Sequence, residues 1–347
     1  MLNPDLRRVA ESLYFGDNST IDLTSGAVAL SPGCQEAFNM FSNISYISER
    51  QAALHTLFAT QLKKEFEMEY ACAYSGTFLA YFVFGPHPHV FLDVLALDDN
   101  GFIDYELTRQ KINRIIEHDL ACTPRSIGKD GIVPHNTILV SNTGYPRLID
   151  WNVIADIASD LGLKVIADIG ETTGLVLSGL NFNPAPWVDA IIGRTSGTMG
   201  GVDSTFIVSR NLIPTQDLCP LAPSELAANI QAVYELHPST GAKDKIQWPI
   251  KIAARIMSDI LVDEGINLLT NGTHQNFVVI DEIGSNDIVG LLSERNIKVS
   301  REGNGRFITL DTTKGVKSGR QEEWFKKVAY DIADIINEYK RGNANGK

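Results

Sequence analysis

The sequence predicts an α/β protein with a large domain that holds a mostly parallel sheet and a small C-terminal α+β domain. Two observations predict this class. Short apolar runs of strand length alternate with stretches of helical periodicity over residues 49–215, and a shorter series of strands and helices follows a connector rich in Pro, Ser and Gly. Such alternation builds a parallel sheet with helices on both faces, and ligands of these sheets bind at the carboxyl ends of the strands.

The individual elements follow from the same periodicities. Residues 49–69 place apolar side chains at helical spacing, and the apolar run 70–74 that follows suits a buried strand. Asp150 is positioned to cap the helix predicted over 150–161. The other predicted strands are 91–95, 137–140, 164–167, 190–193, 205–208, 276–281 and 306–310, and the other predicted helices are 105–118, 249–264, 287–295 and 322–339.

These elements divide the chain into four parts. Residues 1–48 mix short apolar pieces with Gly, Ser and Pro, which predicts an arm packed against something else. The large α/β domain is expected over 49–215, the connector and a long helix over 216–264, and the small α+β domain over 265–347.

Composition limits the classes of partner. The 347 residues are 44% hydrophobic and carry a formal charge of −12, with acidic and basic residues interspersed. Nucleic acid and anionic membranes require a concentrated basic surface, so a small molecule or another protein is the expected partner. The cysteines form no CxxC pair, which predicts neither a zinc site nor a disulfide framework. No apolar stretch reaches the length of a membrane span, and we expect a cytoplasmic protein.

Two segments carry groups suited to binding. Ser75-Gly76-Thr77 lies between a predicted strand and a helix, where N–H groups and hydroxyls form a phosphate cradle, although an ordinary helix cap would look the same. Asp168 ends a buried strand, where a carboxylate needs a specific partner. That partner is either the protonated ring nitrogen of pyridoxal phosphate (PLP) or the turn at residues 169–172.

The central segment resembles serine hydroxymethyltransferase. The resemblance is carried, in order and spacing, by TILVSNTGYPRLIDW (137–151), KVIADIGETTGLV (164–176) and GLNFNPAPWVD (179–189). Residues 99–105, 268–273 and 277–281 add weaker similarity, so that it runs with gaps from about residue 69 to the end. It implies the aminotransferase-like architecture known as PLP fold type I.

Several positions match residues that bind cofactor or substrate in that family. The resemblance implies that Ser75, Gly76 and Thr77 form the phosphate loop, that Thr143 contacts the ring hydroxyl and that Asp168 contacts the ring nitrogen. It also places Arg306 where the family has the arginine that clamps the substrate carboxylate, a role suited to a bidentate donor. The alternative for Arg306 is a surface arginine at the start of a strand.

The departures from the family pattern concern catalysis. Gly197 occupies the position of the lysine that forms the Schiff base with PLP, and Ser196 the position of the preceding histidine. Without an amine, Gly197 provides neither the covalent tether nor the base that moves the α-proton. Glu171 likewise replaces a family histidine. His87 and His89 lie in a shortened segment, each directly after a proline, which predicts loop histidines.

Three functions are compatible with this pattern. The first is an enzyme for an amino-acid-like or one-carbon-related carboxylate that binds PLP or its amine form non-covalently, with Glu171 or a histidine as acid or base; Lys243 or Lys245 could replace the missing lysine. The second is a cofactor-free enzyme in which Glu171, Arg194 and Ser196 form a new site. The third is an inactive homologue that serves as a dimer partner or regulator. The family resemblance and the N-terminal arm predict a homodimer.

Overall fold

The computed structural model describes residues 21–24, 28–42, 49–75, 90–91, 95–122, 137–142, 144–211, 221–237, 240–241, 243–282, 285–302 and 306–345. The chain forms two compact units. The larger unit comprises residues 30–143 and 148–240, and the smaller unit comprises residues 1–29, 144–147 and 241–347.

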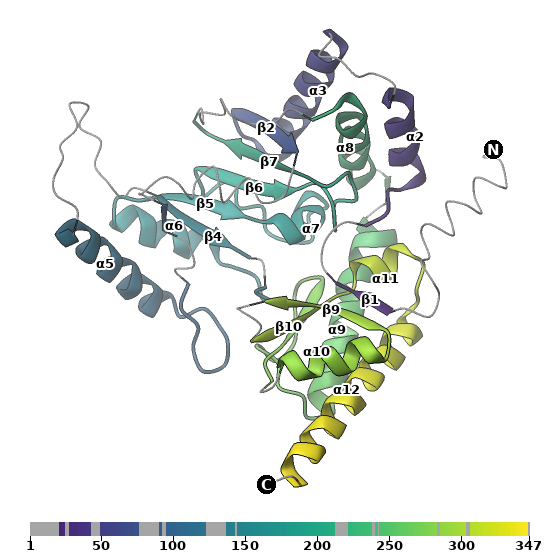
Figure 1. Ribbon diagram of the computed structural model, residues 1–347. Helices are drawn as coiled ribbons and strands as arrows, with labels where there is room; N and C mark the ends of the chain where they lie inside the picture. Colours follow the sequence, from purple (N-terminus) through teal and green to yellow (C-terminus); the bar gives the residue numbers. More distant parts are fainter. Residues whose placement is uncertain are drawn as a thin grey trace. The chain divides into compact units, whose positions relative to one another are not determined.

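A largely parallel sheet forms the centre of the larger unit. Its strands within the described residues lie in the order β2-β7-β6-β5-β4-β3 (Figure 1). The neighbours β3, β4, β5 and β6 pair in parallel, whereas β7 is antiparallel to both β6 and β2. The strands are β2 (Tyr70–Ser75), β3 (Val90–Phe91), β4 (Thr137–Ser141), β5 (Lys164–Asp168), β6 (Ala190–Arg194) and β7 (Ser204–Ser209). This arrangement confirms the predicted α/β class.

Helices pack against this sheet and against one another. Helix α6 packs on β5, α3 packs on β2 and β7, and α8 packs against α2, α3 and α7. Asp150 caps α6 as predicted, because its Oδ1 accepts hydrogen bonds from the N–H groups of Asn152 and Val153. The helices are α2 (Pro32–Phe41), α3 (Glu49–Phe66), α5 (Tyr105–Cys122), α6 (Trp151–Asp160), α7 (Thr173–Leu177) and α8 (Pro223–Leu236).

The smaller unit is a helix-covered sheet with strands from both halves of the sequence. The order in its described part is β1-β9-β10-β8, with β1 parallel to β9 and the other pairs antiparallel. The strands are β1 (Ile21–Leu23), β8 (Phe277–Ile280), β9 (Ile297–Glu302) and β10 (Phe307–Asp311). The helices are α9 (Trp248–Asp263), preceded by the π-helical turn η3 (Lys243–Gln247), and α10 (Ser285–Glu294), α11 (Thr313–Lys317) and α12 (Glu322–Asn345).

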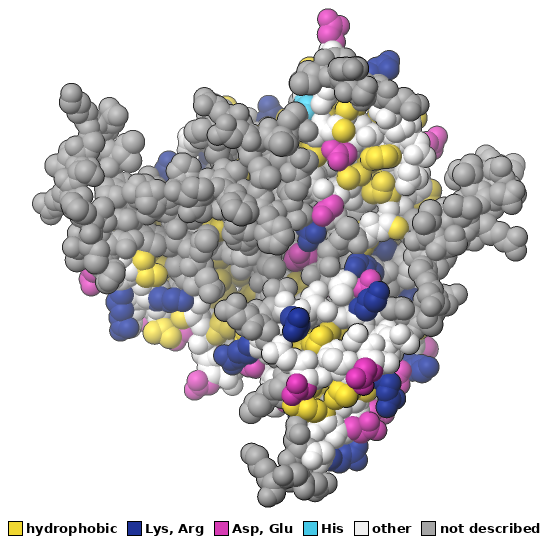
Figure 2. Space-filling view, viewed as in Figure 1, with side chains coloured by type: hydrophobic (Ala, Val, Ile, Leu, Met, Phe, Trp, Pro, Cys, Tyr) yellow, Lys and Arg dark blue, Asp and Glu magenta, His cyan; other side chains and the backbone are white. Residues whose placement is uncertain are grey.

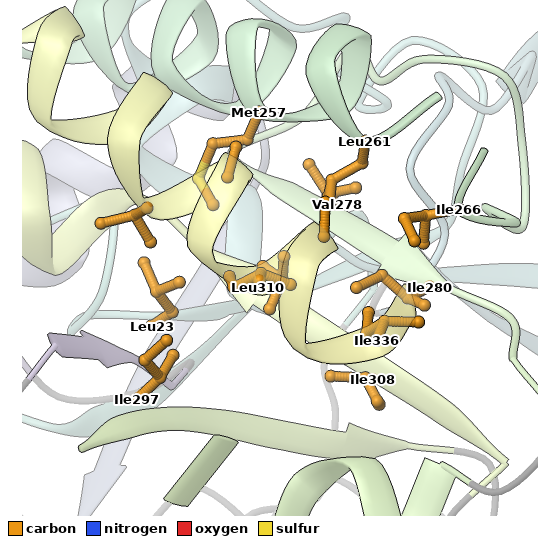
Figure 3. Packing of buried hydrophobic residues seen from close by; sticks show 14 of the residues in the cluster. Leu23, Met257, Leu261, Ile266, Val278, Ile280, Ile297, Ile308, Leu310 and Ile336 are labelled. Carbon is orange, nitrogen blue, oxygen red and sulfur yellow. The ribbon is translucent and has the colours of Figure 1, made fainter. Parts of the chain in front are cut away.

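An apolar core joins these elements of the smaller unit. Figure 3 shows side chains from β1, β8, β9 and β10 directed toward those of α9 and α12. Leu23 from β1 is fully buried in this cluster, and so are Met257 and Leu261 from α9. A single hydrophobic core therefore includes the described strand of the predicted arm.

The two units divide the chain differently from the predicted domains. Within the predicted arm, β1 belongs to the smaller unit and α2 to the larger one. The predicted connector region is divided as well, because α8 belongs to the larger unit and α9 to the smaller. Elements α2, α8, β1 and β9 were not predicted from the sequence.

On the face shown in Figure 2, acidic and basic side chains are interspersed over the described residues. Among the helices that the structure describes, none combines the length and the apolar character that crossing a bilayer requires.

Candidate functional site

The carboxyl ends of β4, β5 and β6 meet at one edge of the larger sheet. The parallel register pairs Ser141 with Asp168 and Asp168 with Ile192. Polar residues at these strand ends therefore lie beside one another, at the edge where sheets of this class bind ligands.

Asp168 is buried at this edge, with 6% of its surface exposed. Its Oδ1 accepts a hydrogen bond from the Gly170 N–H at 2.9 Å, and its Oδ2 accepts one from the Ser141 hydroxyl at 3.0 Å. The hydrogen bond from Gly170 caps the turn that follows β5. This turn is one of the two partners of Asp168 that the sequence analysis considers. The bond from Ser141 additionally fixes the orientation of the carboxylate across two strands.

Arg194, at the end of β6, donates to carboxylates from two segments. Its Nη1 lies 3.1 Å from Glu171 Oε1, in the short turn η1 (Gly170–Thr172), and its Nε lies 2.9 Å from Asp203 Oδ1. Asp203 also accepts a hydrogen bond from the hydroxyl of Ser196, which is 1% exposed. The structure thus brings the predicted residues Glu171, Arg194 and Ser196 together with Asp203.

For Arg194 and Asp203, the ion pairs shift the pKa more strongly than burial does. Burial opposes the charged form of Arg194, but hydrogen bonds and charge from Asp203 and Glu171 raise the pKa of its guanidinium. Burial likewise opposes ionised Asp203, yet hydrogen bonds from Arg194 and Ser196 lower the pKa of its carboxyl. With two carboxylates around one guanidinium, the charge of Arg194 acts within the cluster, which limits its capacity to attract an external anion.

Sequence reasoning missed Asp203. A signal was present, because a half-buried arginine at the end of an apolar strand requires an acidic partner. Asp203 follows a glycine-rich turn just before β7, where the chain returns toward β6.

The turn between β6 and β7 packs against the turn after β5. The Thr198 hydroxyl donates to the Glu171 carbonyl and accepts from the Gly174 N–H, each at 3.0 Å. A Cβ on Gly174 would lie 2.3 Å from the Thr198 carbonyl oxygen. Gly197 has φ +61°, a conformation that glycine adopts without a steric penalty. Ser196 and Gly197, which the sequence resemblance predicts at the positions of the family's histidine and lysine, both lie in this turn.

Most of the predicted cofactor contacts lie outside the described residues. Ser75 ends β2, where its backbone is in register with Ser204. Gly76, Thr77 and Thr143 are outside the described part of the chain, and the same holds for His87 and His89. The predicted phosphate cradle and ring-hydroxyl contact stay predictions.

The other predicted binding residues belong to the smaller unit. Arg306 lies just before β10, and its Nε and Nη2 donate to the Asp281 carboxylate at 3.3 and 3.0 Å. Its side chain is 67% exposed, and its guanidinium carbon lies 4.8 Å from the centroid of the Phe307 ring. The bidentate donor expected to hold a substrate carboxylate is thus engaged by a carboxylate of its own chain. Lys243 and Lys245 lie in η3, where Lys245 is exposed.

The described residues fit one end of a PLP ring. A buried carboxylate, oriented by Ser141 and Gly170, suits a protonated ring nitrogen at the end of β5. For metals, the described part of the chain holds no group of three His, Cys, Asp or Glu side chains that could bind an ion.

The largely parallel sheet, with a buried aspartate at the end of β5, agrees with the large domain of PLP fold type I. Comparison with known proteins makes this more specific. A family model described as serine hydroxymethyltransferase matches residues 126–234. This match supports a serine hydroxymethyltransferase-like protein of the PLP fold type I class.

Curated relatives named serine hydroxymethyltransferase are similar over parts of their length. The protein from Bifidobacterium adolescentis is 26% identical over 51% of this chain and 45% of its own. The protein from Mesoplasma florum is 24% identical over 60% and 55%, and that from Nitratiruptor sp. is 24% identical over 70% and 59%. The chain therefore spans about half the length of the curated relatives it matches.

Proposed function

We propose that this protein is a diverged serine hydroxymethyltransferase-like enzyme that acts on an amino-acid-like or one-carbon-related carboxylate and binds PLP, or its amine form, without covalent attachment. One observation carries the proposal. Asp168 is a buried carboxylate held by two donors at the end of β5. The sequence resemblance further predicts that Gly197, in the turn after β6, occupies the position of the family's lysine.

The proposal gives each residue a task. Ser75, Gly76 and Thr77 would hold the phosphate, Thr143 the ring hydroxyl and Asp168 the ring nitrogen. PLP, when bound, supplies an electron sink for chemistry at the carbon next to the substrate amine.

Glu171 would move a proton at its carboxylate oxygens, since its own carbonyl accepts a hydrogen bond from Thr198, the residue after Gly197. Its ion pair with Arg194, which also donates to Asp203, would fix the side chain for that transfer. Ser196 would support this arrangement through its hydrogen bond to Asp203.

Partners and location form part of the proposal. We expect a cytoplasmic homodimer with a small-molecule carboxylate substrate and with no role for nucleic acid or membrane. The described parts of the predicted arm pair within their own chain, β1 with β9 and α2 with α8, so the dimer expectation rests on the family.

Titration of the purified protein with PLP and with its amine form, by absorbance and calorimetry, tests the proposal. We expect saturable binding of at least one form and at least a tenfold loss of affinity, about 1.4 kcal/mol, in Asp168→Asn. Asp189→Asn is the matched control, because Asp189 accepts a hydrogen bond from the Val165 N–H at the opposite end of the same strand. Borohydride should trap no stoichiometric adduct.

The other outcomes separate the alternatives. An adduct trapped at one equivalent, and absent in Asp168→Asn, would contradict non-covalent binding and identify a substitute lysine such as Lys243 or Lys245 by peptide mapping. Absence of binding of either form would overturn the cofactor hypothesis. A cofactor-free enzyme, or an inactive dimer partner or regulator, would then explain the chain better. The pairing of Arg194 with Glu171 and Asp203 agrees with either alternative.

A further inference from the structure

A buried polar network joins helix α8 to the turn that carries Ser196. Its members are Thr195, Ser204 and Asn229, and each of these residues is 0% exposed. The Asn229 side-chain amide donates to the Ser204 hydroxyl oxygen at 3.0 Å, and that oxygen lies 2.6 Å from Thr195 Oγ1. We call these three residues the buried network. All of them belong to the larger unit.

The buried network closes the hairpin between β6 and β7. Thr195 directly follows β6, and Ser204 is the first residue of β7. The Thr195 N–H donates to the Ser204 carbonyl at 2.9 Å, and the Ser204 N–H donates to Thr195 Oγ1 at 2.9 Å. The Thr195 carbonyl also accepts a hydrogen bond from the Gly201 N–H at 2.7 Å. The buried network therefore constrains both ends of the turn 196–203.

The turn 196–203 has little stiffness of its own. It contains three glycines, of which Gly197 and Gly200 adopt φ values of +61° and +87°. Glycine populates more backbone conformations than any other residue, so a turn of this composition holds one conformation only through contacts with its surroundings. Thr198 supplies such contacts within the turn, and the buried network supplies them at its base.

Asn229 is a costly residue at its position on α8. Its buried neighbours on the helix are apolar, namely Leu226, Ala228 and Ile230. Among the residues that the structure describes, none donates a hydrogen bond to Asn229 Oδ1. A Cβ built on Gly201 would lie 2.3 Å from this oxygen, so the amide packs directly against the turn. A buried acceptor without a donor lowers stability, and the contact of Asn229 with the turn provides the reason for its presence.

The two ends of the turn carry residues of the candidate site. Ser196 follows Thr195, and Asp203 precedes Ser204. The Ser196 hydroxyl donates to the Asp203 carboxylate, and Arg194 Nε donates to the same carboxylate at 2.9 Å. A shift of either end of the turn therefore separates Asp203 from its two donors.

We propose that Asn229 is a positioning residue for the candidate site, because it holds the turn 196–203 through Ser204 and thereby fixes the pairing of Asp203 with Arg194 and Ser196. Hydrogen-bonded groups in a buried network favour one arrangement of the chain over its alternatives. The consequence for ligand binding rests on the proposed function. The effect of Asn229 on the turn does not depend on any ligand.

The pKa of Asp203 reports the state of the turn without a ligand. Burial opposes the ionised carboxylate, but hydrogen bonds from Arg194 and Ser196 lower the pKa below the ordinary value of 3.8. In Asn229→Leu, we expect this pKa to rise toward 3.8, because the carboxylate loses its donors. Carbon-13 NMR of the aspartate carboxyl carbons in the full chain, titrated with pH, measures the shift. The signal missing in Asp203→Asn identifies Asp203.

Titration with PLP and with its amine form measures the consequence for the site. Asn229→Leu should weaken the affinity for the form that wild type binds by about tenfold, which corresponds to about 1.4 kcal/mol. The midpoint of urea unfolding should stay near that of wild type, because leucine fills a similar volume and removes an unpaired acceptor. A residue with a purely structural role would change the midpoint and leave the affinity of the folded protein unaltered.

Two further variants complete the comparison. Ser204→Ala removes the acceptor for Asn229 while leaving α8 unchanged, and it should reproduce the rise in the pKa of Asp203 and the loss of affinity. This variant decides the question if Asn229→Leu fails to fold. Gln231→Leu is the matched control, because Gln231 lies on the same helix but donates to Glu235. It should change neither the pKa of Asp203 nor the affinity.

Three results would overturn the proposal. The first is a pKa of Asp203 that is the same in wild type, Asn229→Leu and Ser204→Ala. The second is a raised pKa in both variants with an unchanged affinity for PLP and its amine form. The third is an equal response in Gln231→Leu. If wild type binds neither form, the proposed function fails, whereas the pKa of Asp203 still decides whether Asn229 holds the turn.

Discussion

Arg194 donates hydrogen bonds to carboxylates from two turns, Glu171 after β5 and Asp203 before β7. The arrangement ties the two turns at the carboxyl edge of the sheet to each other. An arginine held in this way acts first as a structural link and as a positioning residue for Glu171. Loss of either carboxylate should therefore disturb the turn that contains Gly197.

Asp203→Asn tests this link through pH. The pKa of Asp203 in the folded protein lies below the ordinary value of 3.8, so the unfolded chain binds the proton more readily. The stabilisation, on the order of 1 kcal/mol for a partly exposed pair, is complete above that ordinary value and is lost as pH falls through the folded-state pKa. Urea unfolding from pH 3 to pH 7 should show wild type and Asp203→Asn converging at acid pH.

The exposed pair on α9 provides the control. Asp259→Asn removes the partner of Arg255 at 3.8 Å and should change stability by a few tenths of a kcal/mol at most. An Asp203→Asn variant as stable as wild type at pH 7 would show that the link contributes nothing.

Gly197 gives a second prediction at the scale of one residue. Its φ of +61° is costly for residues with a Cβ, so Gly197→Ala should lower the free energy of unfolding by about 1 kcal/mol. Gly197→Lys should cost a similar amount, which separates the backbone penalty from any effect of the new amine. Equal stability of Gly197→Ala and wild type in urea unfolding would contradict the left-handed conformation.

Individual site residues were predicted unequally well. The position of Asp168 followed from a carboxylate at the end of an apolar strand, and its burial at the carboxyl edge is as expected. Asp203 was missed, because its importance arises from a partner nine residues earlier across a hairpin, a contact that no periodicity reveals.

At the scale of elements, the cap of α6 makes a clear prediction. Asp150→Ala removes the acceptor for the N–H groups of Asn152 and Val153 and should lower the free energy of unfolding by about 1 kcal/mol. Asp150→Ser keeps a capping oxygen and should retain most of that stability. Equal unfolding midpoints for Asp150→Ala and wild type would show that the cap contributes little.

Strands buried on both faces were the elements best predicted. Strands β4 to β7 are continuous apolar runs, because the larger sheet buries them, and sequence patterns reveal such runs directly. Strand β9, Ile297–Glu302, has only two apolar residues, Ile297 and Val299, followed by three polar ones, and was missed. Strand β1 has three residues, too few for any pattern.

At the scale of the whole molecule, the boundaries of the two units depend on contacts between distant segments. Ile21 pairs with Ile297, and Lys314 Nζ donates to the Thr24 hydroxyl at 2.6 Å. Pairings between residues so far apart along the chain produce no local sequence pattern. The fold class was therefore predictable, whereas the membership of β1 in the smaller unit was not.

Leu23→Ala tests that membership. Leu23 is fully buried in the core of the smaller unit, so its truncation should lower the stability of that unit by about 2 to 5 kcal/mol. Hydrogen exchange followed by mass spectrometry should show the loss of protection in β9 and β10, with β5 and β6 unaffected. Leu57→Ala, at a 40% exposed position on α3, is the control.

The pairing of β1 with β9 also bears on the order in which a ribosome delivers the chain. Strand β1 emerges early, but its partner strand is complete only when residue 302 has been added. Throughout most of synthesis, the strands and helices that bury Leu23 in the core of the smaller unit have not yet been made. A nascent chain therefore carries an unpaired apolar strand until nearly the last helix, which makes this segment a natural point of contact for molecular chaperones.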